Sequence, residues 1–298
     1  MISILISIFN HDPSALVKGL SSQGQKLDQP YEIIVGNDCS ESKFMPVFDQ
    51  LDKLAGVRCF HSVHNIGRSR IRNTLASMAK YSYLLFIDGD AEVFSEDFIQ
   101  QYLNASESGL VLCGGTAYWD IAPIDKDKVL RWKYGLKREA RTAEQRNIKA
   151  YSSFSSFNFL IPADIFGKNL FDENIIRYGH EDTIFGIELE KNNIRINHID
   201  NQMIHTGLDS AVHFLEKTRE GILNLVEIEN SYYDKEALYR HIRLLKKYNS
   251  IRRYRLHSFL SLINWLAGKS IKRNLTGSSP SLRLFDLYKL CLINDIKG

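Results

Sequence analysis

The sequence lacks several features that would assign it to a class at once. It has four cysteines in 298 residues, and they lie scattered, without the spacing of a metal site or a disulfide framework. No run approaches 18 uncharged apolar residues, which argues against a membrane-spanning helix. The net charge of +3 gives no reason to expect a nucleic-acid partner. We therefore expect a cytoplasmic protein with an ordinary hydrophobic core.

What is present is an alternation of strand and helix signals over the first 115 residues. The N-terminal apolar run has no basic segment and no small-residue cleavage site, so it is predicted to be a strand and not a signal peptide. Alternating strands and helices predict a largely parallel sheet with helical cover. The strand signals lie at 2–9, 31–35, 57–60, 83–87 and 110–113, and 68–80 has helical spacing.

The second half of the chain is less regular. Residues 118–151 are mixed, basic and aromatic, and we expect a loop-rich rim or lid there. After His205 the sequence favours helices almost to the end. These patterns predict a domain over residues 1–230 and a helical, basic extension over 231–298.

One basic run lies within this extension. The stretch "RHIRLLKKYNSIRRYR", Arg240 to Arg255, precedes the apolar segment "LHSFLSLINWLAG", Leu256 to Gly268. That segment is too short to span a bilayer, but beside basic residues it is compatible with peripheral contact at the inner face of a membrane. Packing on the rest of the chain and a homodimer surface are the alternatives.

The stretch "LLFIDGDAEV" ends a predicted buried strand in two carboxylates, Asp88 and Asp90. Carboxylates at this spacing repel each other unless a cation joins them, and a hard divalent ion prefers oxygen ligands. An EF-hand is excluded because Val93 and Ile99 stand where it needs glycine and glutamate. An aspartyl phosphatase, a metal–diphosphate site and a solvated turn remain open on this motif alone.

Further motifs occur at other predicted strand ends and helix starts. With the first strand and the D-x-D turn, the segments in chain order are Ile2–Asn10, "NDCS" at Asn37–Ser40, "NIGRSRIRN" at Asn65–Asn73, Asp88–Asp90 and "GHED" at Gly179–Asp182. Together they resemble the family 2 glycosyltransferases of GT-A fold, whose motifs occur in the same order. That resemblance covers roughly residues 1–215 and implies a Rossmann-like, mostly parallel sheet with helices on both faces.

The resemblance implies which residues bind the nucleotide of a nucleotide-sugar donor. Asp38 matches an aspartate that contacts the base, although Asn37 replaces the first aspartate of the family's pair. Asn65 and Gly67 match the start of the next motif. Arg72 and Asn73 match its Arg-Asn end, with an arginine close to the base or the phosphates.

The resemblance also implies the metal and the catalytic groups. Asp88 would face the ribose or the metal, Asp90 would coordinate Mn²⁺ or Mg²⁺, and His205 would supply a further ligand. Asp182 matches the general base of the inverting members, and Glu181 would hydrogen-bond the acceptor sugar. Acidic residues at a helix start are also ordinary helix chemistry, so this role depends on the other motifs.

The expected function is that of an inverting glycosyltransferase of the hexosyltransferase type. It would move a sugar from a nucleotide-diphosphate donor, with UDP favoured, to a glycan or lipid-linked acceptor, in bacterial polysaccharide synthesis. A GT-A-like module that binds nucleotide or glycan without turnover is the alternative, because Asn37 departs from the family pattern. An aspartyl phosphatase has the least support.

Overall fold

The computed structural model describes residues 1–298, and the chain divides into two compact units. We call Met1–Ala117, Ala140–Ile176 and Ile184–Gly207 the sheet unit. We call Tyr118–Glu139, Arg177–Thr183 and Leu208–Gly298 the helical unit. Each unit combines segments that are distant in sequence. The expected boundary between residues 230 and 231 stays a prediction.

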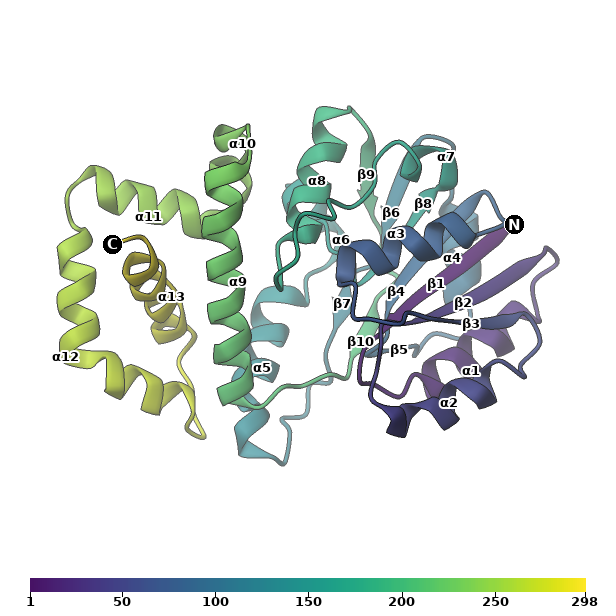
Figure 1. Cartoon of the computed structure of the whole chain (residues 1–298), viewed down its shortest axis with the longest axis horizontal. Coiled ribbons are helices and arrows are strands. Elements are labelled where there is room, and N and C mark those ends of the chain that lie inside the picture. Colours follow the sequence, from purple (N-terminus) through teal and green to yellow (C-terminus); the bar gives the residue numbers. More distant parts are fainter. The chain divides into compact units, whose positions relative to one another are not determined.

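The sheet unit is built on a seven-stranded sheet with the order β3-β2-β1-β4-β8-β6-β9 (Figure 1). All neighbouring pairs are parallel except those of β8, which is antiparallel to β4 and β6. The predicted mostly parallel sheet is therefore confirmed. The strands are β1 (Ile2–Ile8), β2 (Tyr31–Asn37), β3 (Val57–His61), β4 (Tyr83–Asp88), β6 (Leu110–Cys113), β8 (Asn158–Pro162) and β9 (Arg195–His198).

Both faces of this sheet are buried, which explains why its central strands are continuous apolar runs. Successive side chains point to opposite faces, so Ile4 and Ile6 join one core cluster and Leu5 joins the other. The first cluster includes α1 (Ser14–Gly24), α2 (Met45–Leu51) and α4 (Phe98–Ala105). The second includes α3 (Arg68–Met78), α7 (Ala163–Phe166) and α8 (Glu181–Lys191). Helices thus cover both faces, as expected.

A small second sheet extends the chain beyond the end of β4. Its strands are β5 (Ala91–Glu92), β10 (Met203–His205) and β7 (Thr116–Ala117), in the order β5-β10-β7. β10 pairs antiparallel to β5, and His205 stands opposite Ala91. This pairing brings residues that are more than 110 positions apart next to the D-x-D turn.

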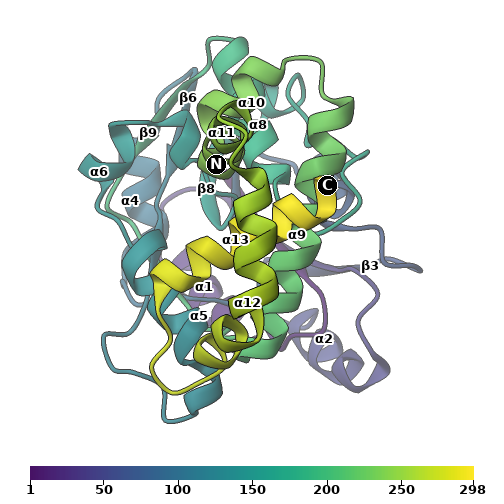
Figure 2. The same cartoon turned by 90° about the vertical axis from the view of Figure 1, so that its left-hand side faces the viewer.

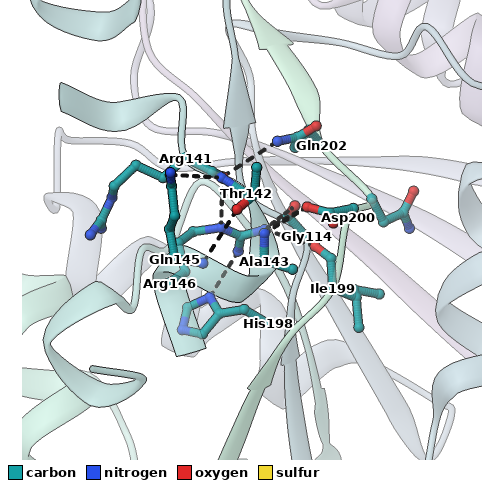
Figure 3. A network of polar contacts seen from close by, with 12 residues as sticks. Gly114, Arg141, Thr142, Ala143, Gln145, Arg146, His198, Ile199, Asp200 and Gln202 are labelled. Atoms are coloured by element: carbon teal, nitrogen blue, oxygen red, sulfur yellow. Dashed lines mark hydrogen bonds and ion pairs between the residues drawn. The ribbon is translucent and has the colours of Figure 1, made fainter. Parts of the chain in front are cut away.

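Arg146 in α6 (Ala143–Asn147) fixes the chain where β6 and β9 end (Figure 3). Its buried guanidinium donates to the carbonyl oxygens of Cys113, Gly114 and Ile199, at 3.0, 3.0 and 2.8 Å. It also donates to Nδ1 of His198 at 2.8 Å. Since β7 follows Gly114 by two residues and pairs with β10, this network supports the small sheet.

The buried His198 gives this network a pH dependence. Arg146 donates to Nδ1, so the ring proton lies on Nε2, which donates to the Ala150 carbonyl at 2.9 Å. Burial, opposed by that bond to Ala150 and aided by Arg146, lowers the pKa of His198 to about 4. Between about pH 4 and about pH 6.5, His198 is therefore protonated in the unfolded chain and neutral in the folded chain.

We expect the free energy of unfolding to be fully retained above pH 6.5 and to fall by up to about 3 kcal/mol as the pH drops to about 4. Carboxylates also titrate near the lower limit, so the difference from a His198→Asn variant is the informative quantity. Urea unfolding of both proteins at several pH values measures it. Parallel stability–pH curves for the two proteins would contradict this assignment.

The helical unit packs around one apolar cluster that includes Leu130, Leu215, Leu275 and Phe285. α13 packs against both α9 and α12 (Figure 2). None of the helices combines the length and apolar character that a membrane crossing needs. The helices are α5 (Val129–Tyr134), α9 (Ala211–Ser231), α10 (Lys235–His241), α11 (Arg243–Arg253), α12 (His257–Leu275) and α13 (Leu282–Lys297).

The segment expected to be a loop-rich rim is more regular than its sequence indicates. α5 continues into a π-helical turn at Gly135–Glu139. Arg131 lies buried there, donating to Glu139 at 3.0 Å and to the Tyr118 hydroxyl at 2.8 Å. The basic composition suggested an exposed, loop-rich segment, but the charge of Arg131 is paired in the interior of the helical unit.

Candidate active site

Polar side chains join the carboxyl ends of β1 and β2. The Asn10 N–H donates to Ser40 Oγ, and the Glu41 N–H donates to Asn10 Oδ1, both at 2.8 Å. Asn37 is buried and accepts from the Ser40 N–H at 2.8 Å. An amide oxygen shapes this turn as a carboxylate would, so the departure from the family's first aspartate leaves the turn intact.

Asp38 holds the loop that precedes α3. Its Oδ1 accepts from the Ile66 N–H at 2.7 Å, and its Oδ2 accepts from the Gly67 N–H at 3.0 Å. Asn65 Nδ2 donates to the Asp38 carbonyl at 3.2 Å. The structure thus brings together three of the predicted nucleotide residues. Each carboxylate oxygen can accept a second bond, so base contact by Asp38 stays a prediction.

Arg72 and Asp88 form an ion pair in the interior of the sheet unit. Arg72 Nη2 lies 2.7 Å from Asp88 Oδ1, and the guanidinium lies over the Phe171 ring, 5.3 Å from its centre. The Arg72 side chain is 3% exposed and that of Asp88 is 20% exposed. A buried cation requires a partner, so the charge of Asp88 already neutralises Arg72. Any contact of Asp88 with a ribose or a metal would be shared with this pair.

Asp90 pairs instead with His205, across the β5–β10 ladder. His205 Nε2 lies 3.5 Å from Asp90 Oδ2, and His205 stacks on Phe157 with ring centres 5.3 Å apart. The Asp90 carbonyl accepts from the N–H and the hydroxyl of Thr206, at 2.9 and 2.8 Å. Two of the predicted metal ligands therefore adjoin each other on an anchored backbone.

Two glycines leave room around these carboxylates. A Cβ at Gly207 would lie 2.4 Å from Asp90 Oδ2, so a larger residue there would push that carboxylate out of its present position. A Cβ at Gly89 would lie 2.1 Å from Ile8 Cδ1, so β1 packs directly against the D-x-D turn. The close packing of β1 thus explains why the residue between the two aspartates is a glycine.

These residues fit a divalent cation of the expected kind. Asp90 supplies an oxygen ligand and His205 a nitrogen ligand, while no group of three or more such side chains occurs anywhere in the structure. Mg²⁺ and similar ions commonly take one or two protein ligands and complete their shell with substrate phosphates and water. A pair of ligands is therefore suited to an ion that arrives with a diphosphate.

Asn73 is hydrogen-bonded to the segment that contains Phe171. Its Nδ2 donates to the Phe171 carbonyl at 2.9 Å and to Glu173 Oε1 at 3.0 Å, and its Oδ1 accepts from the Phe171 N–H at 3.1 Å. These contacts tie residues 171–173 to α3. A direct contact between Asn73 and a nucleotide stays a prediction, and its visible role is to fasten that segment.

Glu181 and Asp182 begin α8 and belong to the helical unit. Glu181 is buried, whereas Asp182 is partly exposed and its Oδ1 accepts from the N–H and the hydroxyl of Thr183, at 2.6 and 3.2 Å. His180 precedes them in a left-handed conformation, with φ of 71°. Burial lowers the pKa of His180, although the charge of Glu181 opposes that shift.

The loop before Glu181 is fastened to α9. Arg177 pairs with Glu227 at 2.9 Å and with Glu220 at 3.3 Å. The buried Asn224 donates through Nδ2 to the carbonyl oxygen of Gly179. Glu220, Asn224 and Glu227 lie one helical turn apart, on a single face of α9. This face therefore positions the start of α8.

The sequence prediction missed Gly207 and Asn224. Gly207 lies two residues after His205, but a single glycine in "HTGLDS" carries no signal of its own. Asn224 lies more than 40 residues from the loop it holds, within an ordinary amphipathic helix. Only the folded chain reveals either contact.

A sequence profile of glycosyl transferase family 2 matches residues 3–166, which is just over half of the chain. The chain belongs to glycosyl transferase family 2. The match includes every predicted site residue from Asp38 to Asp90 and ends before Glu181, Asp182 and His205. The resemblance to this family that was read from the motifs is confirmed.

Solved structures give the family 2 chain the GT-A fold. TarS of S. aureus is 19% identical with a TM-score of 0.51, over 81% of this chain and 42% of TarS. The mannosyltransferase PcManGT of Pyrobaculum calidifontis, in complex with GDP-Man and Mn²⁺, is 11% identical with a TM-score of 0.59, over 100% of this chain and 87% of that one. GalNAc-T7, with UDP, GalNAc and Mn²⁺, is 15% identical with a TM-score of 0.53, over 80% and 49%.

The chain thus spans less than half of the TarS chain that it matches. No curated protein matches the family 2 chain. At these identities the structural likenesses establish the fold.

Proposed function

We propose that this chain is an inverting glycosyltransferase that moves a sugar from a nucleoside-diphosphate donor to a hydroxyl of a glycan or lipid-linked acceptor. The observation that carries the proposal is the Asp90–His205 pair, beside a glycine that leaves the carboxylate accessible, at the carboxyl end of β4. Ligands gather at such strand ends in open α/β sheets.

Each residue of the proposal has its own part. Asp90 and His205 would hold Mn²⁺ or Mg²⁺, which when bound offsets the charge on the departing diphosphate. Asp38 and Asn65, with Gly67, would shape the base pocket, and the Arg72–Asp88 pair would border the ribose and the phosphates. Asn73 would act through the segment it fastens.

In the reaction, the acceptor oxygen attacks the anomeric carbon as the bond from that carbon to the phosphate oxygen breaks. The leaving nucleoside diphosphate keeps the electron pair. Asp182 takes the proton from the attacking hydroxyl, and Glu181 hydrogen-bonds the acceptor sugar. A single displacement of this kind inverts the anomeric configuration.

UDP is the nucleotide we favour, with GDP as the comparison. GalNAc-T7 is solved with UDP, and PcManGT with GDP-Man. Membrane contact and a homodimer are the two competing uses of the basic C-terminal helices, and sugar transfer as proposed requires neither.

A thermal-shift panel of UDP- and GDP-sugars, each with Mn²⁺ or with EDTA, tests donor use. We expect a UDP-sugar with Mn²⁺ to raise the melting temperature by several degrees, because a ligand at 100 times its Kd stabilises by about 2.7 kcal/mol. EDTA should remove most of that shift. If no nucleotide sugar shifts the melting temperature, the proposal fails.

A further inference from the structure

The surface of α12 carries an apolar stripe that nothing in the chain covers. Leu260, Ile271 and Leu275 form the buried side of this helix. On its other side Phe259, Trp265 and Leu266 are 64%, 81% and 67% exposed. Single exposed apolar residues are ordinary, but large ones side by side mark an interaction surface.

Basic residues flank this stripe in the sequence, before α12 and within its second half. Leu262, Leu266, Lys269 and Arg273 follow at intervals of four, three and four residues, which keeps them on one side of the helix. All four are exposed, as are Arg252, Arg253 and Arg255 just before the helix. We call these residues, with Phe259 and Trp265, the α12 face.

The stretch of sequence that carries the α12 face has charges of a single sign. Residues 237–285 contain eleven lysines and arginines and no aspartate or glutamate. The whole chain has a net charge of +3, so the remaining residues together carry −8. Such segregation produces a strongly positive local field on a protein that is nearly neutral overall.

We propose that the α12 face binds the surface of an anionic lipid bilayer. Aromatic and aliphatic side chains between basic residues match the two layers of that surface, with the rings among the acyl chains and the cations at the headgroups. A polyanion without an apolar layer would make no apolar contact with Trp265 and Phe259. A second copy of this chain would bring two strongly positive segments together, which disfavours dimerisation through this face.

This mode of binding is peripheral and reversible. The 19 residues of α12 include basic ones, and its inner side remains packed on α13. Attachment then combines two moderate contributions, apolar insertion and attraction to anionic lipid. Loss of either should release the protein, and salt should weaken the electrostatic one.

Flotation of the full chain with vesicles tests the proposal. We expect at least tenfold more protein bound to vesicles that contain about one third phosphatidylglycerol than to pure phosphatidylcholine vesicles. Raising the salt from about 0.1 M to about 0.5 M should remove most of this binding. Equal binding to both kinds of vesicle, or none to either, would overturn the proposal.

Two sets of variants locate the contact. Trp265→Ser with Leu266→Ser should lower binding about tenfold, and Ile124→Ser with Val212→Ser, which alters exposed apolar residues elsewhere, should not. The triple variant Arg253→Gln, Lys269→Gln and Arg273→Gln should also lower binding about tenfold. Its control is the triple variant Lys26→Gln, Lys53→Gln and Lys168→Gln, which should leave binding unchanged. All these side chains are exposed, so the melting temperature should stay unchanged and exclude misfolding as the cause.

Self-association is measured in parallel by sedimentation without lipid. A dimer that Trp265→Ser dissociates, together with no difference between anionic and neutral vesicles, would assign the α12 face to a second copy and overturn the proposal. A monomer that floats only with anionic vesicles supports it. Neither result depends on sugar transfer, so this test stands apart from that of the proposed function.

Discussion

Replacing Asp90 with asparagine is expected to lower kcat/KM for Mn²⁺-dependent sugar transfer by roughly 10²- to 10⁴-fold. The substitution keeps the shape of the side chain and removes its charge. A divalent ion would then lose the one aspartate of the D-x-D turn that is not paired with an arginine. The loss of several kcal/mol of charge stabilisation corresponds to that range of rates. Initial rates over a Mn²⁺ titration measure it, and the apparent Mn²⁺ affinity should fall as well.

The fold should not suffer from this change. The main chain at Asp90 is held through its carbonyl by Thr206, which the substitution leaves untouched. Glu92→Gln is the matched control, because Glu92 is an exposed carboxylate on the adjoining strand β5. Transfer by Asp90→Asn within about tenfold of the parent, at an unchanged Mn²⁺ optimum, would contradict the proposed metal role.

Asp88→Asn, unlike Asp90→Asn, should destabilise the fold. It breaks the pair with the buried Arg72, so we expect the free energy of unfolding to fall by roughly 2–4 kcal/mol. The contrast separates the two aspartates of one motif: Asp90 is accessible beside Gly207, while Asp88 stabilises the interior. Urea unfolding of both variants distinguishes them without any assay of transfer.

The strands and the D-x-D turn were predictable because local sequence determines them. β1 and β4 are buried on both faces and read as apolar runs, and the motif lies directly after β4. The individual roles of the two carboxylates were not predictable, since they depend on Arg72 and on the register that places His205 opposite Ala91. Contacts between residues so distant in the chain leave no periodicity in either segment.

The same limit applies to the residues named for the nucleotide. Asp38, Asn65 and Gly67 do meet, because a strand end and the start of α3 are neighbours in this kind of sheet. Asn73 follows Arg72 in the chain, yet its side chain binds residues 171–173, as the 100° step between helical residues allows. A motif match names positions, and the helix determines which of them face a ligand.

Replacing Asp182 with asparagine is expected to lower kcat by roughly 10²- to 10⁴-fold, the usual contribution of a positioned general base. The KM for the donor and the Mn²⁺ affinity should remain, because other residues are proposed to bind both. Asp164→Asn is the matched control, an exposed carboxylate that also lies in the first turn of a helix. Steady-state rates with a saturating donor measure the effect, and an unchanged kcat would remove Asp182 from the mechanism.

The proposed role of Asp182 extends to α9 through the loop that Asn224 holds. In Asn224→Ala the Gly179 carbonyl loses its buried donor, so we expect a loss of about 1–2 kcal/mol of stability and a fall in kcat. Asn230→Ala, at an exposed position further along the same helix, should change neither. If Asn224→Ala lowered stability alone, with kcat intact in the folded fraction, the loop would not need this anchor for catalysis. A fall in kcat at constant donor KM would instead show that α9, through Asn224, positions the base, which ties this helix to the reaction.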